Sequence, residues 1–180
     1  MFQFIGKCFF LVLLCLFSNC KKENYYTSVP DSNEPANIDI VIHGFTGQGY
    51  KKQSLEWDVQ ADVSYVSYAT SKIEMKNLHL LSYGSPPETT QITSDAATMN
   101  RDTSDMIIRD NVEVKSSNGR QLYTNLLNWD NAKKELFTDA PVKIIYPDGE
   151  IIHGMGMKSN GGLDKLIIYQ PVGVHTSNND

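Results

Sequence analysis

Apolar and polar residues alternate with a period of two along much of this chain. Between Leu55 and Tyr65 every second residue is apolar, and the residues between them are Glu56, Asp58, Gln60, Asp62 and Ser64. Ile38, Ile40 and Ile42 show the same spacing a little earlier. Successive side chains of a strand point to opposite faces, so the pattern predicts β-strands with one buried face and one face in water.

Turn-forming residues separate the β-rich segments that follow. The turns are predicted at Ser117-Asn118-Gly119, Asp130-Asn131, Pro147-Asp148-Gly149 and Asn160-Gly161-Gly162. The strands between them are predicted at residues 106–114, 121–129, 135–137, 142–146, 150–153 and 166–170. Because no window shows a helical stripe, and strands recur at short intervals, the sequence predicts an all-β sandwich, barrel or roll.

Three segments interrupt the regular pattern. Residues 84–94 contain Pro86-Pro87 with several Ser and Thr, and are predicted to be a loop between strands. Gly44, Gly47 and Gly49 precede a strand and do not open a helix, so they predict a hairpin or bulge and no phosphate cradle. Between Thr124 and Leu127 the apolar spacing breaks, which predicts a bulge that swaps the two faces downstream.

The N-terminal residues have the pattern of a bacterial lipoprotein signal. Lys7 is followed by an apolar run, Cys8 to Phe17, which is short beside the ~18 to 20 apolar residues of a membrane span. Ser18 and Asn19 then precede Cys20, which cleavage would leave as a lipidated first residue. An ordinary secretory signal and an uncleaved anchor are the alternatives.

The rest of the chain then has room for one domain. We expect a signal peptide over residues 1–19, a lipidated cysteine with a flexible polar tether over 20–37, a β-domain over 38–173 and a polar tail over 174–180. Cys8 and Cys15 leave with the signal, so no disulfide is expected. The net charge of -5 and the pI near 5.3 argue against a nucleic-acid partner.

Residues with catalytic or metal-binding chemistry are scattered. His43, His79, His153 and His175 have no ligand spacing around them, so no metal or other cofactor is expected. Asp58 and Asp62 fit the solvated face of a strand better than a pair of catalytic carboxylates. No serine occupies a nucleophile elbow. The sequence therefore predicts a protein that is not an enzyme.

The apolar faces of the strands must be covered, because several hundred Å² of exposed apolar surface would be costly at ~25 cal/mol per Å². The cover is either the other strands, as a plain hydrophobic core, or a lipid-sized apolar ligand. For the second case the candidate lining residues are Trp57, Val59, Ala61, Met75, Val112, Val114, Leu122, Val142, Ile144, Ile167 and Tyr169.

The order and spacing of many short motifs resemble the LptC family of lipopolysaccharide export proteins. The likeness runs from about Gly49 to Tyr169, and its motifs are residues 55–61, 95–97, 110–114 with Gly119, Leu122 and Thr124, 127–130, Lys134, 138–142 and 154–157. The resemblance implies a twisted, slightly open antiparallel β-jellyroll whose groove holds the acyl chains of lipopolysaccharide, with no covalent chemistry.

The resemblance also implies partners. One open end would meet the inner-membrane ABC transporter, and the C-terminal edge strand, with Leu166, Ile168 and Gln170, would pair with the next jellyroll of a periplasmic bridge. LptC-like proteins are commonly held by a transmembrane helix, whereas this chain carries a lipidation pattern. We expect it at the periplasmic side of the inner membrane, although Lys21 and Lys22 do not decide between the two membranes.

Two other function classes remain open from the sequence alone. One is a surface or periplasmic adhesive or structural β-sandwich lipoprotein with a sealed core. The other is a small hydrolase, which would need Ser or Asp to converge with His153.

Overall fold

A computed structural model describes residues 37–84 and 88–175 of the chain. All of them belong to one unit, Pro35–Asp180. The predicted signal peptide, Cys20, all but the last residue of the tether and the final residues 176–180 lie outside the described residues. In the part of the chain that is described, no helix is long and apolar enough to span a membrane.

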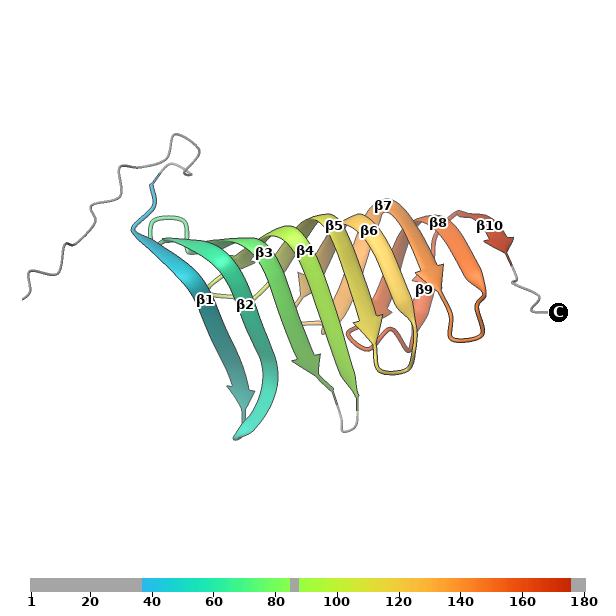
Figure 1. Cartoon of the computed structure of the whole chain (residues 1–180), viewed down its shortest axis with the longest axis horizontal. Helices are drawn as coiled ribbons and strands as arrows, with labels where there is room; N and C mark the ends of the chain where they lie inside the picture. Colours follow the sequence, from blue (N-terminus) through green and yellow to red (C-terminus); the bar gives the residue numbers. More distant parts are fainter. Residues whose placement is uncertain (1–36, 85–87, 176–180) are drawn as a thin grey trace, which may run out of the picture. The chain divides into compact units, whose positions relative to one another are not determined.

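Ten antiparallel strands form a single sheet (Figure 1). They are β1 (Ile40–Lys51), β2 (Ser54–Ser67), β3 (Lys72–Tyr83), β4 (Thr89–Asn100), β5 (Met106–Ser116), β6 (Gln121–Asp130), β7 (Glu135–Ile145), β8 (Ile151–Asn160), β9 (Leu166–Ile168) and β10 (Pro171–His175). Each strand from β1 to β8 pairs with the next one in the chain, and both β9 and β10 pair with β8. The all-β class and the open β-jellyroll are confirmed.

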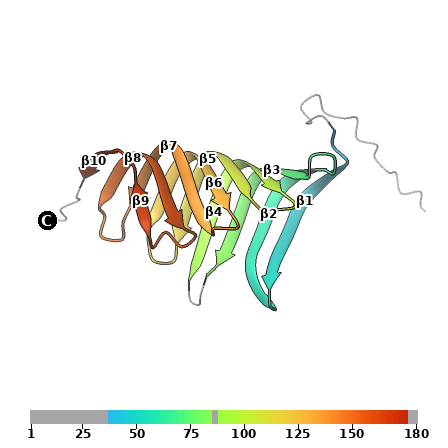
Figure 2. The same cartoon turned by 180° about the vertical axis from the view of Figure 1, so that it is seen from behind.

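Irregularities cross the middle of the sheet from strand to strand. The register shifts between Thr93 and Ala96 in β4, between Arg109 and Val112 in β5, between Thr124 and Asn128 in β6, and between Thr138 and Pro141 in β7. Left-handed backbone occurs on the same line, at Gly44, Asn77, Asp110, Asn111 and Gly156. Bulges bend and twist a strand, so the aligned bulges fold the sheet over, as seen from both sides in Figures 1 and 2.

Short polar side chains hold this bend. Asn77 donates a hydrogen bond to Asp62 at 2.7 Å, and Asn111 donates one to Asp95 at 2.6 Å. Asn and Asp tolerate the left-handed conformation better than branched residues do. The motif residues Asp95 and Asp110-Asn111 therefore lie where the sheet folds.

The bend divides the sheet into two facing layers. Layer A comprises residues 40–43, 63–67, 72–76, 96–100, 106–109, 126–130, 135–138 and 157–160 with β9. Layer B comprises residues 45–51, 54–61, 78–83, 89–94, 112–116, 121–124, 141–145 and 151–154 with β10. The hydrophobic core lies between them and takes side chains from both, such as Leu127 and Leu136 from layer A and Val114 and Leu122 from layer B.

All four predicted turns are confirmed, since each separates two strands, and the predicted bulge after Thr124 is also present. In β6 the buried positions change from Leu122 and Thr124 to Leu127, which is the predicted swap of faces. The same swap occurs in β2, where Val59 and Ala61 are buried before Asp62, and Ser64 and Val66 after it.

The bulge predicted at Gly44, Gly47 and Gly49 is present, since these glycines lie inside β1 and its register with β2 shifts between Gly49 and Tyr50. Two predictions about segments are wrong. Most of the predicted loop 84–94 is strand, since β4 begins at Thr89. The sheet extends through His175 and so includes the start of the predicted tail.

Candidate functional site

A cavity of about 630 Å³ lies between the two layers in the half of the sheet nearer β1. Its apolar wall has two tryptophans and eight aliphatic side chains: Leu55, Trp57, Val59, Leu80 and Ile92 from layer B, and Met99, Met106, Ile108, Trp129 and Leu136 from layer A. A partly open, largely apolar space of this size suits a drug-sized apolar ligand or part of a larger one. Because the two methionines are flexible, the wall can adapt to mobile chains.

Charged side chains surround the mouth of this cavity. Lys51, Lys52 and Lys134 contribute three ammonium groups, against the carboxylates of Glu56 and Glu88. Glu56 lies between two of the lysines, with its oxygens 3.6 Å from Lys51 Nζ and 3.9 Å from Lys134 Nζ. The mouth therefore carries an excess of positive charge in a chain whose net charge is -5.

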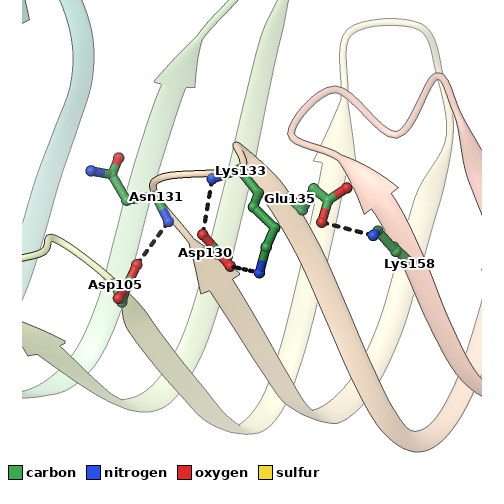
Figure 3. Close-up of polar contacts among 6 residues, drawn as sticks. All are labelled: Asp105, Asp130, Asn131, Lys133, Glu135 and Lys158. Carbon is green, nitrogen blue, oxygen red and sulfur yellow. Dashed lines mark hydrogen bonds and ion pairs between the residues drawn. The ribbon is translucent and has the colours of Figure 1, made fainter.

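Polar contacts hold the turn between β6 and β7 (Figure 3), and Lys134 belongs to this turn. Asp130 Oδ1 accepts the backbone N–H of Lys133 at 2.9 Å, and Asp130 Oδ2 pairs with Lys133 Nζ at 2.6 Å. The hydrogen bond from the Lys133 ammonium holds the pKa of the Asp130 carboxyl below its usual value, and the pKa of Lys133 is raised in turn.

Two further contacts join this turn to its neighbours in Figure 3. The backbone N–H of Asn131 donates to Asp105 Oδ1 at 2.8 Å, and Lys158 pairs with Glu135 at 2.9 Å. Lys134 itself donates to Asn131 Oδ1 at 2.8 Å, and its ammonium lies 5.8 Å from the ring centre of Trp129. The ammonium of Lys134 is thus held beside the aromatic wall of the cavity.

The other half of the interior is filled. Leu163, in the connection between β8 and β9, is only 1% exposed and belongs to the core. The neighbouring residues Asn160, Gly161 and Gly162 line the end of the cavity. The space between the layers is therefore open towards β1 and closed towards β10.

The predicted lining residues fall into three groups. Trp57 and Val59 line the cavity. A second group is buried in the core away from the cavity wall: Ala61, Met75, Val112, Val114, Leu122, Val142 and Ile144. Ile167 and Tyr169 are 56% and 47% exposed, so their predicted inward orientation is wrong. Leu166 and Ile168 pack against the core instead, because the pairing of β9 with β8 turns those two side chains inward.

The sequence reasoning missed most of the cavity wall. Leu80, Ile92, Met99, Met106, Ile108, Trp129 and Leu136 line it, as do the three lysines. Trp129 was the clearest signal, since it ends a predicted strand beside a turn. The edge residues Leu166, Ile168 and Gln170 do lie in or beside β9, at the C-terminal side of the sheet.

A second, shallower depression of about 480 Å³ lies on the outer surface near the bend. Its polar side chains include Glu113, Tyr123, Lys143 and His153. A hydrogen bond from Lys115, with a second from Tyr123, keeps the pKa of the Glu113 carboxyl low, and the pKa of Tyr123 is raised by the same carboxylate. These contacts tie neighbouring strands together on the outer face.

Within residues 37–84 and 88–175, no group of three His, Cys, Asp or Glu side chains is placed to hold a metal ion. Asp58 accepts a hydrogen bond from Gln48 on the outer face, and Asp62 takes part in the bend. The cavity combines an apolar wall with charged side chains at its mouth.

Comparison with known proteins gives one clear finding. The family model described as LptC, lipopolysaccharide-assembly, LptC-related, matches residues 8–176 of the chain. No curated protein sequence matches the chain.

Proposed function

The chain belongs to the LptC family of lipopolysaccharide-assembly proteins, and from this premise we propose that it binds lipopolysaccharide noncovalently and carries it between an inner-membrane ABC transporter and a periplasmic β-jellyroll bridge. The family acts in lipopolysaccharide transport and is associated with the periplasmic side of the inner membrane. The observation that carries the proposal is the apolar cavity with a cationic mouth.

The chemistry of the cavity matches the two parts of an anionic amphiphile. Acyl chains are driven into the apolar space by about 0.8 kcal/mol for each CH₂ group removed from water. An anionic headgroup stays at the mouth, where Lys51, Lys52 and Lys134 supply positive charge. Glu56 is the counter-ion that such a headgroup would displace.

The two edges of the sheet support strand addition by partners. At one side β1 pairs only with β2 among the described strands, and at the other side β9 and β10 pair only with β8. Free edges of this kind accept a strand from another sheet. We assign the β1 end to the transporter and the edge formed by β9 and β10 to the bridge protein, which would align the interiors of successive jellyrolls.

Anchoring is part of the same proposal. A lipid on Cys20, followed by a polar tether up to Asn37, would hold the domain near the membrane while leaving it free to move by some tens of ångströms. Replacement of Cys20 by Ala should release the protein from membranes into the periplasmic fraction. Retention of the Cys20→Ala variant in the membrane would show that another segment anchors it.

Photocrosslinking from single positions tests the binding site. A photoreactive residue at Trp57 or Met99, on opposite walls of the cavity, should capture lipopolysaccharide in cells with an active transporter. Gln60, which is exposed on β2, is the matched outer-face control. Capture only at Gln60, or at none of the three positions, would contradict the proposal and favour a structural β-sandwich with a sealed core.

A further inference from the structure

The connection between β8 and β9 divides the interior of the sheet. We call residues 160–165 the strap. Asn160, Gly161 and Gly162 line the end of the cavity, and the next residue, Leu163, is buried between the layers. Beyond it the core is aliphatic and contains Val114, Leu122 and Ile144. An apolar chain that entered from the β1 side would therefore meet the strap before reaching the β10 side.

The strap is held mainly by polar contacts to one place, the turn between β5 and β6. Arg120 Nη1 donates to the carbonyl of Leu163 at 2.6 Å, and Ser116 Oγ donates to the carbonyl of Gly162 at 2.7 Å. Asn118 Nδ2 donates to Asp164 Oδ1 at 2.8 Å. The contact between Asn118 and Asp164 is exposed and the other two are part-buried, so water that reaches the strap as it moves can take over these hydrogen bonds.

The backbone of the strap has an unfavourable conformation at one residue. Leu163 has a φ of 58°, in the left-handed region that a leucine rarely adopts. Such a conformation persists only where surrounding contacts enforce it. The two glycines before Leu163 allow a wide range of backbone angles, whereas regular pairing with β8 begins only at Leu166.

We propose that the filled half of the interior is a second binding compartment for linear alkyl chains, closed by Leu163 in the free protein and opened when a chain displaces the strap. This inference rests on the proposed function and adds to it the route by which the chains reach the β10 edge. The buried apolar area stays about the same when a chain displaces Leu163, because a few methylene groups of the chain bury as much apolar area as the leucine side chain that they replace.

The proposal explains a mismatch between cavity and cargo. The cavity of about 630 Å³ has the size of a site for one drug-sized ligand, while a lipid with several acyl chains is larger. Displacement of the strap would join the open space to the aliphatic region beyond it. Leu163 then decides how far along the sheet the chains extend.

The test uses the full-length protein and lipopolysaccharide that carries a diazirine at the end of an acyl chain, with labelled residues mapped by mass spectrometry. Arg120→Ala loosens the strap. Arg101→Ala is the matched control, because Arg101 stacks on Tyr68 at 4.7 Å just as Arg120 stacks on Tyr146 at 5.3 Å, but does not touch the strap. Labelling of Met99 and Met106 reports the cavity, and labelling of Leu122 and Ile144 reports the second compartment.

We expect the share of label in the second compartment to rise several-fold in Arg120→Ala and in Leu163→Ala, and to stay unchanged in Arg101→Ala. The same share in all variants, with the cavity still labelled, would overturn the second compartment and leave the proposed function intact. Absence of label from the cavity in every variant would overturn both.

Hydrogen exchange on the unsubstituted protein gives an independent measurement. The backbone N–H groups of Asp164 and Lys165 both donate to Asn160 Oδ1, at 2.8 and 3.2 Å, in the closed strap. Added lipopolysaccharide should speed the exchange of these amides. Unchanged or slower exchange while the cavity is labelled would contradict displacement of the strap.

Discussion

The carboxylate of Glu56 on β2 and the ammonium of Lys134 in the turn between β6 and β7 form an ion pair at 3.9 Å between the two layers. Both side chains are partly exposed, so the pair adds little to stability. Its position matters more than its energy, because it lies at the mouth of the apolar cavity.

The first prediction exploits this pair. Lys134→Gln should weaken binding of lipopolysaccharide by about 1 kcal/mol, or roughly five-fold in Kd. Glu56→Gln should strengthen it by a similar factor, since the competing counter-ion is removed. Titration calorimetry at low salt measures both, with Lys72→Gln, which lies away from the cavity, as the control. Equal effects of the three substitutions would rule out a cationic headgroup site at this mouth.

The second prediction concerns a buried hydroxyl. Ser64 is fully buried at the bend, and its Oγ has no hydrogen-bond partner among the described residues. Ser64→Ala removes this unsatisfied group and should stabilise the fold by about 1 kcal/mol. Ser94 is the matched control, because its Oγ donates to the carbonyl of Ala96 at 3.0 Å, so that Ser94→Ala should lose about 1 kcal/mol. Urea unfolding of the two variants distinguishes them by the sign of the change.

The third prediction is a pH dependence of the turn that holds Lys134. The pKa of Asp130 is lowered in the folded protein by the hydrogen bond from Lys133. A lowered carboxyl pKa contributes stability above the pKa of the unfolded chain, and this contribution is lost as the pH falls through the folded pKa. NMR titration should show a low pKa for Asp130 that rises towards its ordinary value in Lys133→Ala.

Glu113 provides the internal reference for that titration, since its pKa is lowered chiefly by Lys115 and should not respond to Lys133→Ala. If the pKa of Asp130 stayed low in Lys133→Ala, the backbone N–H groups of the turn and not the ammonium would be its cause.

The fourth prediction tests the C-terminal edge. Val172 on β10 is 75% exposed, so Val172→Lys should change the free energy of unfolding by no more than about 0.5 kcal/mol. A charge on an edge strand opposes strand addition, and docking of a periplasmic bridge jellyroll should therefore be lost in a pull-down. Ile40→Lys, on β1 at the opposite edge, should instead spare the bridge and impair the transporter contact. Loss of both partners in either variant would contradict the assignment of the two ends.

Ile168, on the neighbouring strand β9, is less suited to this test than Val172. In the structure Ile168 packs against the core and lies where a Cβ on Gly154 would overlap it. A proline at Ile168 would disturb folding and docking together, whereas Val172 is outside the core.

The local pattern of the sequence determined the class of fold. Alternating residues form strands because successive side chains point to opposite faces, and Asn-Gly or Asp-Gly pairs end them because these residues adopt turn conformations at low cost. Both effects act between neighbours in the chain, so β5, β6 and the four turns were predictable. The motifs of the LptC family could be recognised in the sequence because each of them consists of neighbouring residues.

Only the tertiary structure decided which apolar side chains form a cavity and which form a core. Trp57 and Ala61 occupy the same face of β2, yet only Trp57 lines the open space. Gly49 has no room for a side chain because the indole of Trp57 on the neighbouring strand lies where its Cβ would be. A period of two predicts which face of a strand a residue occupies. The aligned bulges then exchange the two faces, and the strap fills the end of the interior towards β10. Both the bulges and the strap depend on contacts between residues that are distant in the sequence.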